Sequence, residues 1–347
     1  MIHRILATLG SRAVTAVLSL VLIFLAVRMA LTQAALVQVE GRIAALKQRG
    51  VVTEPVKLNP PKIPIRENSA PLYQAAIELV SNYPYQSAER SQASETAENF
   101  VRLLQGTEAP ELQEALRLLE LASQRPGCAF NRNYELGFSM PSPNFIGIRA
   151  LCRLALADAK LSQQAGKTDL AARRLTQLSL FLRRGDLNKT LMGHAILLSC
   201  VREMTENLQS FQLHDPGLRA ELSLLEADVE KGFTQSIQGE RACGIDCFGK
   251  IQNDHHLISV MNDPNGKVSL LEWIFGVTGN SLILLDELNY LELMQQAEDA
   301  AQSGRAAAPL KPGLPYWMSS WIVPNFNKIH QRHQEVQEKL HQTIDRL

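Results

Sequence analysis

The stretch NFIGIRALCRLALADAKLSQQAGKTDLAARRLTQLSLFLRR, residues 144–184, decides the fold class because it holds two helical patterns joined by a very short turn. Over residues 144–164 the apolar side chains recur at helical spacing, at Ile148, Leu151, Cys152, Ala155 and Ala159. Gly166 can end this helix, since glycine accepts the left-handed conformation that many helix ends need. Thr168 can cap the next helix, over 168–184. A joint this short predicts an antiparallel helical hairpin.

Two further helices are expected directly after the hairpin, over residues 188–212 and 215–237. Asp215 is a capping residue, and Pro216 suits the first helical turn. None of the four helices can bury its apolar stripe alone, so they must pack on one another. Val and Ile do not alternate with polar residues over any long run, so the sequence predicts an all-α fold rather than a sheet.

The hairpin has part of the tetratricopeptide pattern. Small and apolar residues fall at roughly the right offsets, at Ala159, Gly166, Ala171 and Leu175. The large aromatic positions of that repeat are missing, and no second copy follows at a period of about 34 residues. The sequence therefore favours an ordinary, TPR-like helical hairpin over a repeat array.

The N-terminal segment is apolar enough to enter a lipid bilayer. Residues 5–31 have the length of a spanning helix if Arg12 and Arg28 reach the head groups. A signal peptide cleaved near Ala34 and a buried core helix are the alternatives. Arg28 directly after the apolar core argues against cleavage. We therefore expect residues 1–34 to form a single-pass membrane anchor.

Charge does not settle the orientation, because basic residues flank both ends of the apolar segment. A short N-terminal tail before a long domain usually leaves that domain on the far side. The sequence thus predicts a protein of a bacterial inner membrane whose main domain is extracytoplasmic.

The remaining chain divides into three parts. Residues 35–66 form an amphipathic juxtamembrane helix and a proline-rich spacer, which four prolines predict to be an extended strut. Residues 67–304 form the helical domain, with further helices expected at 68–83, 95–105, 109–124, 268–275 and 280–303. Residues 305–347 comprise a Pro-rich aromatic segment and a helix over 325–347, which either docks on the core or pairs with another chain.

The chain also resembles a known group of proteins. The succession Glu67-Asn68-Ser69-Ala70-Pro71-Leu72-Tyr73, then Leu136-Gly137-Phe138, then Arg149 through Gly166, is similar to bacterial single-pass, membrane-anchored helical proteins known only as uncharacterised. The resemblance covers about residues 67–241 and consists of helix starts and packing positions. It implies an anchored helical domain and no activity.

The richest set of reactive side chains lies in an expected loop over residues 238–266, and comprises Glu240, Cys243, Cys247, Asp254, His255 and His256. A disulfide between the two cysteines would suit an exported domain. A metal site is disfavoured, since the spacing is not that of zinc ligands and adjacent histidines usually point apart. Catalysis by a cysteine with a histidine lacks the flanking pattern of a known hydrolase. The simplest explanation is that these are polar residues of a solvent-exposed loop.

Other residues have structural interpretations that outweigh functional ones. Glu240 and Arg241 can form a buried ion pair at a turn, and a ligand-binding role for Arg241 is the alternative. We expect His194 to be a hydrogen-bonded core histidine. The rings of Tyr316, Trp317 and Trp321 either form an interaction surface or cover the end of the core.

Residues 125–143 form a loop long enough to be functional, and it holds Cys128, Tyr134 and Phe138. Cys128 is a second candidate for a bridge, whereas Cys152 and Cys200 read as small core residues.

Thirty-five basic and 35 acidic side chains give zero formal net charge, so no general field attracts nucleic acid. The sequence contains no phosphate-binding glycine loop, nucleophile elbow or metalloprotease motif. We therefore expect no cofactor, no enzyme activity and no nucleic-acid partner. The predicted role is structural, or the binding of another protein. The alternatives are an enzyme or metal-binding protein that uses the Cys243–His256 loop, and a ligand-binding groove between helices.

Overall fold

The computed structural model describes residues 2–82, 97–105, 110–211, 213–254, 280–304, 319 and 326–347, with side-chain surroundings from residue 14 on. Within these ranges the chain forms helices and no strands, which confirms the all-α prediction. The described residues divide into two compact units. The first unit contains 2–53, 243–254, 280–296 and 319, and the second contains 54–82, 97–105, 110–211, 213–242, 297–304 and 326–347.

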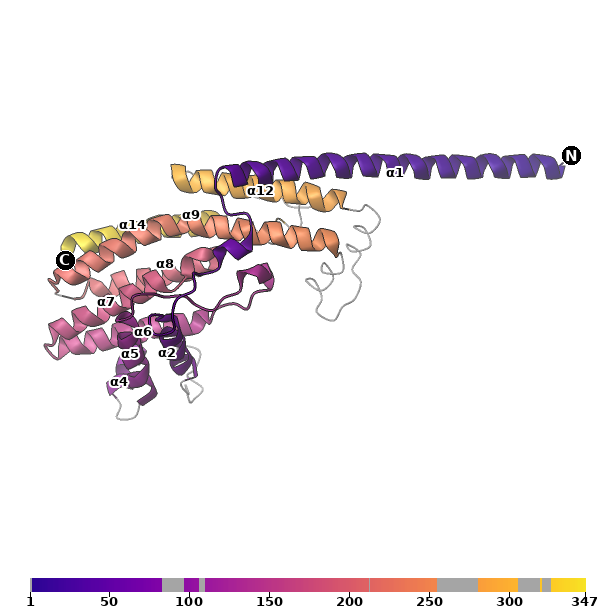
Figure 1. Cartoon of the computed structure of the whole chain (residues 1–347). Helices are drawn as coiled ribbons and strands as arrows, with labels where there is room; N and C mark the ends of the chain where they lie inside the picture. Colours follow the sequence, from indigo (N-terminus) through magenta and orange to yellow (C-terminus); the bar gives the residue numbers. More distant parts are fainter. Residues whose placement is uncertain are drawn as a thin grey trace. The chain divides into compact units, whose positions relative to one another are not determined.

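The first unit begins with α1 (Ile2–Gln48), the long helix labelled in Figure 1. It contains an apolar window of mean hydropathy 2.5, none of which is buried. Its large side chains from Val14 to Leu31 are exposed. Among the described residues, this is the one helix long and apolar enough to cross a membrane, a test that a signal sequence also passes.

The C-terminal half of α1 is amphipathic, as the sequence predicts. Ala35 and Val39 are buried and pack with Leu284 of α12 (Ser281–Ser303). A hydrogen bond of 2.9 Å from Arg49 to Gln295 Oε1 joins the same two helices. The apolar segment therefore continues, without a break in the helix, into a packed part of the first unit.

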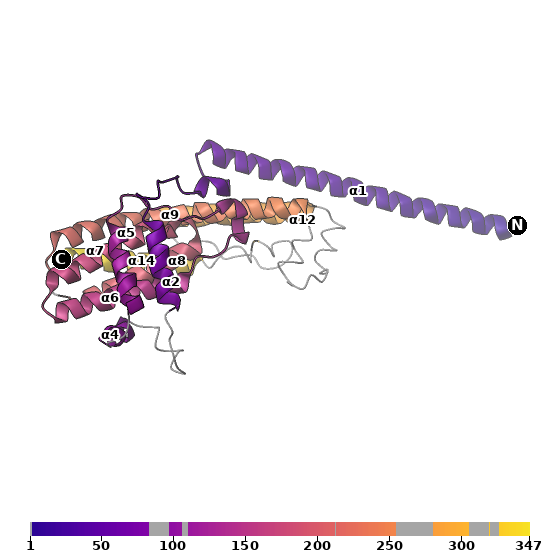
Figure 2. The same ribbon diagram turned by 60° about the horizontal axis from the view of Figure 1, so that its bottom comes forward.

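The second unit is a stack of helical pairs around one core (Figures 1 and 2). Its helices are α2 (Ala70–Asn82), α4 (Ala97–Gln105), α5 (Pro110–Ser123), α6 (Phe145–Gln164), α7 (Thr168–Arg184), α8 (Leu191–Leu208) and α14 (Phe326–Arg346). The 3-10 turns in the described residues of this unit are η1 (Pro55–Leu58), which precedes α2, η2 (Tyr134–Ser139) between α5 and α6, and η3 (Leu187–Lys189) between α7 and α8. The helix α9 (Pro216–Asn253) contributes residues to both units.

The hairpin of α6 and α7 confirms the pattern that the sequence shows. Asn144 caps α6 by accepting a 2.8 Å bond from Gly147 N–H. Gly166 has φ 72°, as a left-handed helix end requires. The capping role expected of Thr168 is wrong: Thr168 already lies inside α7, and Lys167 precedes it without a side-chain cap.

The expected loop over residues 238–266 is also wrong where the structure describes it, because α9 continues to Asn253. The glycines there allow close packing instead of ending the helix. A Cβ on Gly239 would clash with the carbonyl oxygen of Lys189, and one on Gly244 would clash with the ring of Tyr290. Small residues in a helix thus mark sites of close approach to a neighbour.

Two terminal segments of the second unit pack on its helices. The proline-rich segment is not simply an extended strut, since it contains η1 with Pro55 and Leu58 buried. The helix α14 packs along α8, and its Val336, Leu340 and Ile344 join the core cluster. Of the two alternatives for this helix, the structure therefore shows docking on the core.

Candidate functional site

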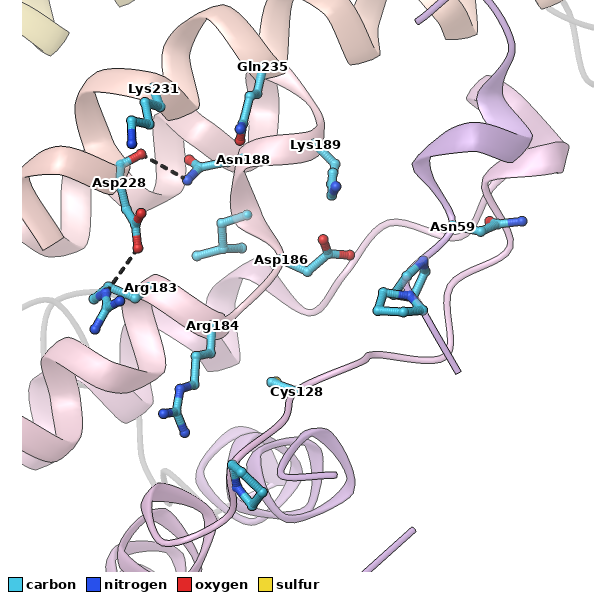
Figure 3. Close-up of a pocket in the computed structure, with 14 residues that line it drawn as sticks. Asn59, Cys128, Arg183, Arg184, Asp186, Asn188, Lys189, Asp228, Lys231 and Gln235 are labelled. Atoms are coloured by element: carbon cyan, nitrogen blue, oxygen red, sulfur yellow. Dashed lines mark hydrogen bonds and ion pairs between the residues drawn. The ribbon is translucent and has the colours of Figure 1, made fainter. Parts of the chain in front are cut away.

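The second unit contains a cavity of about 360 Å³ beside the turn between α7 and α8 (Figure 3). Three segments far apart in sequence form its walls: the proline-rich segment, the loop after α5, and the α7–α8 turn with α9. Its lining residues are Asn59, Pro60, Pro61, Pro126, Cys128, Arg183, Arg184, Asp186, Leu187, Asn188, Lys189, Asp228, Lys231 and Gln235. Most of them are polar or charged, so the cavity differs from the apolar groove that a small hydrophobic ligand would need.

The turn itself is built on an unusual backbone conformation. Asp186 has φ 54° and ψ 34°, and within the described residues it is the one non-glycine with a positive φ. Aspartate tolerates this left-handed region better than most residues, but at some cost. The conformation lets the chain leave α7, form η3 and enter α8 within six residues.

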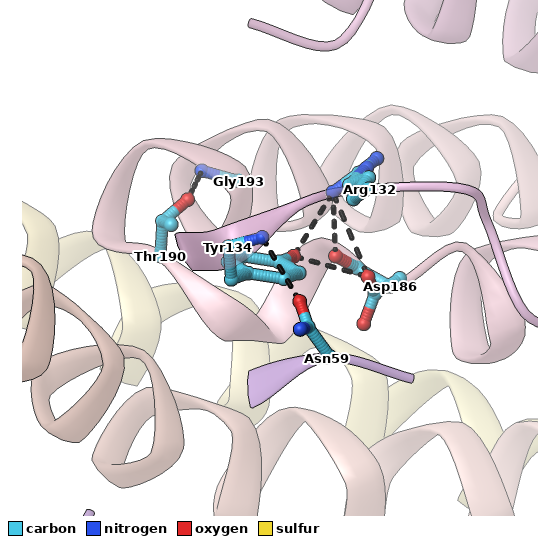
Figure 4. Close-up of polar contacts among 6 residues, drawn as sticks. All are labelled: Asn59, Arg132, Tyr134, Asp186, Thr190 and Gly193. Carbon is cyan, nitrogen blue, oxygen red and sulfur yellow. Dashed lines mark hydrogen bonds and ion pairs between the residues drawn. The ribbon is translucent and has the colours of Figure 1, made fainter. Parts of the chain in front are cut away.

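Two side chains from the loop after α5 hold Asp186 in place (Figure 4). Tyr134 Oη donates a 3.0 Å hydrogen bond to Asp186 Oδ2, and Arg132 Nη1 donates one of 3.0 Å to the Asp186 carbonyl oxygen. Tyr134 is fully buried, and its own N–H donates to Asn59 Oδ1 at 2.9 Å. The three wall segments are therefore tied together at one point.

Burial controls the protonation of this network. Removal from water raises the pKa of the Asp186 carboxyl, while the Arg132 charge, the Tyr134 hydrogen bond and the Lys189 charge act against that rise. Burial also raises the pKa of the Cys128 thiol to about 11, so this cysteine is a neutral thiol near pH 7. The cavity thus contains no activated nucleophile among these groups.

Asp228, the other carboxylate that lines the cavity, forms an ion pair. Arg183 Nε donates to Asp228 Oδ2 at 2.9 Å, and its Nη1 donates to Glu221 Oε1 at 2.6 Å. Glu221 and Asp228 both lie on α9, so Arg183 fixes the end of α7 against that helix.

Asn188 connects the cavity to a buried histidine cluster. Its Nδ2 donates to the Asp228 carbonyl at 3.3 Å, which leaves its Oδ1 to accept from His194 Nδ1 at 2.9 Å. His194 Nε2 then accepts from Nδ1 of His333 at 3.3 Å. Phe233 stacks on both imidazoles. The expectation of a hydrogen-bonded core histidine is confirmed.

Burial keeps these imidazoles neutral. Loss of hydration lowers the pKa of His194 to about 3 and that of His333 to about 4, with a smaller contribution from a neighbouring histidine in each case. The described residues contain no group of three or more His, Cys, Asp or Glu side chains arranged for a metal ion.

Glu240 and Arg241 are buried, but they do not form the turn that the sequence suggests. Arg241 Nη2 donates to Glu298 Oε2 at 2.6 Å, in the C-terminal part of α12. Glu240 Oε2 accepts instead from the Leu191 N–H at the start of α8. Burial raises the pKa of Glu240 to about 7. Both residues act in helix packing at the middle of α9.

The reactive set expected around residues 240–256 is only partly described. Cys243 and Cys247 are buried thiols one turn apart on α9, and their disulfide stays a prediction. His255 and His256 lie outside the described residues, so the structure does not test the Cys243–His256 site. Tyr316, Trp317 and Trp321 also lie outside them. The buried positions of Cys152 and Cys200 agree with their role as core residues.

Sequence reasoning identified the loop of residues 125–143 but missed the cavity beside it. Arg184, Lys189 and Lys231 stand in unremarkable helix-end and helix-surface contexts. The short polar run Arg183-Arg184-Gly185-Asp186 between two apolar helices was the available signal.

Comparisons of this chain with protein-family models, with curated proteins and with solved structures found no match.

Proposed function

We propose that this chain is a membrane-tethered helical protein with a structural or protein-interaction role and no catalytic activity. The observation that supports the tether is the exposed apolar surface of α1 from Val14 to Leu31. These 18 positions extend about 27 Å as a helix, close to the thickness of a bilayer core of about 30 Å. Of these positions only Arg28, near the C-terminal end, is charged. An apolar surface of this size is stable in lipid and prone to aggregate in water.

The proposed location is a bacterial inner membrane, with the folded units on the extracytoplasmic side. This part of the proposal rests on the short N-terminal tail and on the resemblance to uncharacterised anchored helical proteins. Single-pass insertion leaves the long C-terminal part of the chain outside the bilayer, where it can contact other proteins.

Alkaline extraction of membranes tests the tether. The wild-type chain should stay in the pellet, and a Val21→Arg/Phe24→Arg variant should move to the supernatant, because each central arginine costs about 3 kcal/mol in the bilayer. Val37→Arg is the control, since Val37 is an exposed apolar residue of the same helix that lies beyond Leu31, where the proposed membrane-spanning segment ends. A wild-type chain released by alkali would contradict the proposal.

Cross-linking in intact membranes tests the interaction role. We expect repeated cross-links from the second unit to the same partner protein. Cross-links scattered among abundant membrane proteins would contradict that role.

The cavity favours a second candidate function, the binding of a small ligand. Its volume of about 360 Å³ lies at the lower end of the range of ligand pockets, about 300–1,000 Å³. Its walls are tied by the Tyr134, Asp186 and Asn59 hydrogen bonds, so the space is preformed. The chemical class of that ligand follows from the charges around it.

A further inference from the structure

The charges that line the cavity are not balanced. Four cationic side chains face it, those of Arg183, Arg184, Lys189 and Lys231, against the two carboxylates of Asp186 and Asp228. We propose that the cavity binds a small organic anion through phosphate or carboxylate groups. This inference deepens the ligand-binding candidate and does not depend on the membrane tether.

Both carboxylates already have partners, and the charge of Lys189 also acts on Asp186. The uncompensated lining cations are therefore Arg184 and Lys231, with Lys189 beside an acid that Arg132 and Tyr134 already contact. Asp228 pairs with Arg183 at 2.9 Å, and Asp186 accepts from Tyr134 and lies 3.9 Å from Arg132. In the described part of the chain, no carboxylate lies within ion-pair distance of Arg184, Lys189 or Lys231. An anion in the cavity would supply the missing negative charge.

The three cations come from three separate elements and line one space (Figure 3). Arg184 ends α7, Lys189 belongs to η3, and Lys231 lies on α9. Arg184 is held, because its Nη1 donates to the Arg125 carbonyl at 2.7 Å. A guanidinium fixed on one side presents its remaining N–H groups in a fork that suits phosphate and carboxylate oxygens.

The rest of the lining indicates that the anion has an organic body. Pro60, Pro61, Pro126 and Leu187 provide rigid apolar walls, and a bare inorganic ion would leave them uncovered. The amides of Asn59, Asn188 and Gln235 add neutral hydrogen-bonding groups. The lining therefore combines a majority of polar and charged groups with a smaller apolar part, which suits an anion that carries a compact organic body.

The backbone of Asp186 is a second, independent observation. Left-handed conformations of non-glycine residues are concentrated at functional sites, where surrounding contacts maintain them. Here Arg132 and Tyr134 hold Asp186, a residue that lines the cavity, in the left-handed conformation. Hydrophobic packing alone would not require an aspartate in this conformation, since glycine adopts it without strain.

Calorimetric titration of the full chain in nanodiscs tests the proposal. Glycerol 3-phosphate and citrate serve as the phosphate and carboxylate probes, and sodium chloride at matched ionic strength is the blank. We expect saturable one-to-one binding of at least one probe, and the probe that binds identifies the anionic group. Arg184→Gln and Lys231→Gln should each weaken the binding at least tenfold.

Arg219→Gln is the matched control, because Arg219 is an exposed cation on the same helix as Lys231 and does not line the cavity. It should leave the affinity unchanged. The exposed Lys231 side chain can be replaced without disturbing the core, so Lys231→Gln keeps the test valid if Arg184→Gln fails to fold. No saturable binding of either probe, or equal weakening by the control, would overturn the proposal. Because membrane extraction is measured separately, failure of the tether would not be mistaken for failure of this site.

Discussion

Tyr134 Oη donates a 3.0 Å hydrogen bond to Asp186 Oδ2 across 52 positions of the sequence. The bond joins the loop after α5 to the turn between α7 and α8, and it maintains the one left-handed non-glycine residue in the described chain. The Tyr134 hydroxyl therefore shares with Arg132 the task of holding this wall of the cavity. Removal of the Tyr134 hydroxyl therefore tests how much this hydrogen bond contributes to stability.

Tyr134→Phe should destabilise the second unit by about 1–2 kcal/mol, since it leaves a buried carboxylate without one of its donors. Denaturant unfolding of the full chain measures the loss. Tyr73→Phe is the matched control, because the buried Tyr73 hydroxyl has no hydrogen-bond partner among the described residues. That change should be neutral or stabilising. Equal losses in the two variants would contradict the assigned role of Tyr134.

The buried pair of Arg241 and Glu298 gives a second prediction. Arg241→Met should cost about 3–5 kcal/mol, because it leaves the Glu298 carboxylate buried without its cation. The double variant Arg241→Met/Glu298→Met should recover much of that loss, since neither member of the pair is then left buried and charged without the other. Arg117→Met, which breaks an equally short but exposed pair with Glu114, should have no measurable effect on unfolding. A double variant as unstable as the single one would count against this explanation.

Two glycines of α9 should respond in opposite directions to alanine. A Cβ on Gly239 would clash with the Lys189 carbonyl oxygen, so Gly239→Ala should destabilise the protein by about 1–3 kcal/mol. A Cβ on Gly249 would meet nothing within 4 Å, so Gly249→Ala should stabilise the helix by about 0.5–1 kcal/mol. Thermal unfolding followed by circular dichroism shows whether each variant is less or more stable than the wild type. Two changes of the same sign would show that α9 is packed differently.

The histidine cluster predicts a specific dependence of stability on pH. His333 has a folded-state pKa of about 4, below its ordinary value of 6.5. The unfolded chain therefore binds the extra proton first, and stability is lost as the pH falls from about 6.5 toward 4. Glu240 acts in the opposite direction, because burial raises its pKa to about 7 and acidification relieves that cost. The contribution of His333 is therefore obtained from the difference between the pH dependence of stability in the wild type and in a His333 variant.

His333→Asn retains a donor near the position of Nδ1 but removes the titration. Below pH 6.5 its stability should fall less steeply than that of the wild type, by up to about 1.4 kcal/mol per pH unit. Denaturant unfolding between pH 7.5 and 4.5 measures both slopes. Parallel slopes for His333→Asn and the wild type would refute the prediction.

The helices could be predicted from local patterns, whereas the cavity could not. The bounds of α7, residues 168–184, follow from apolar spacing and end signals, which lie within the segment itself. The continuation of α9 was missed because its glycines resemble loop residues until the neighbouring Lys189 and Tyr290 are known. The cavity joins Asn59, Arg184 and Lys231, which are separated by more than 40 residues each. No local pattern relates such residues, since tertiary packing alone brings them together.

The retention of the N-terminal helix is the central claim of the proposed function, and the mass of the mature protein tests it most directly. Protein isolated from alkali-washed membranes should have the intact mass of 38.5 kDa, with residues 5–31 present. Cleavage near Ala34 would remove the apolar segment and leave a lighter, extractable chain. Recovery of that shorter chain in the soluble fraction would contradict the tether.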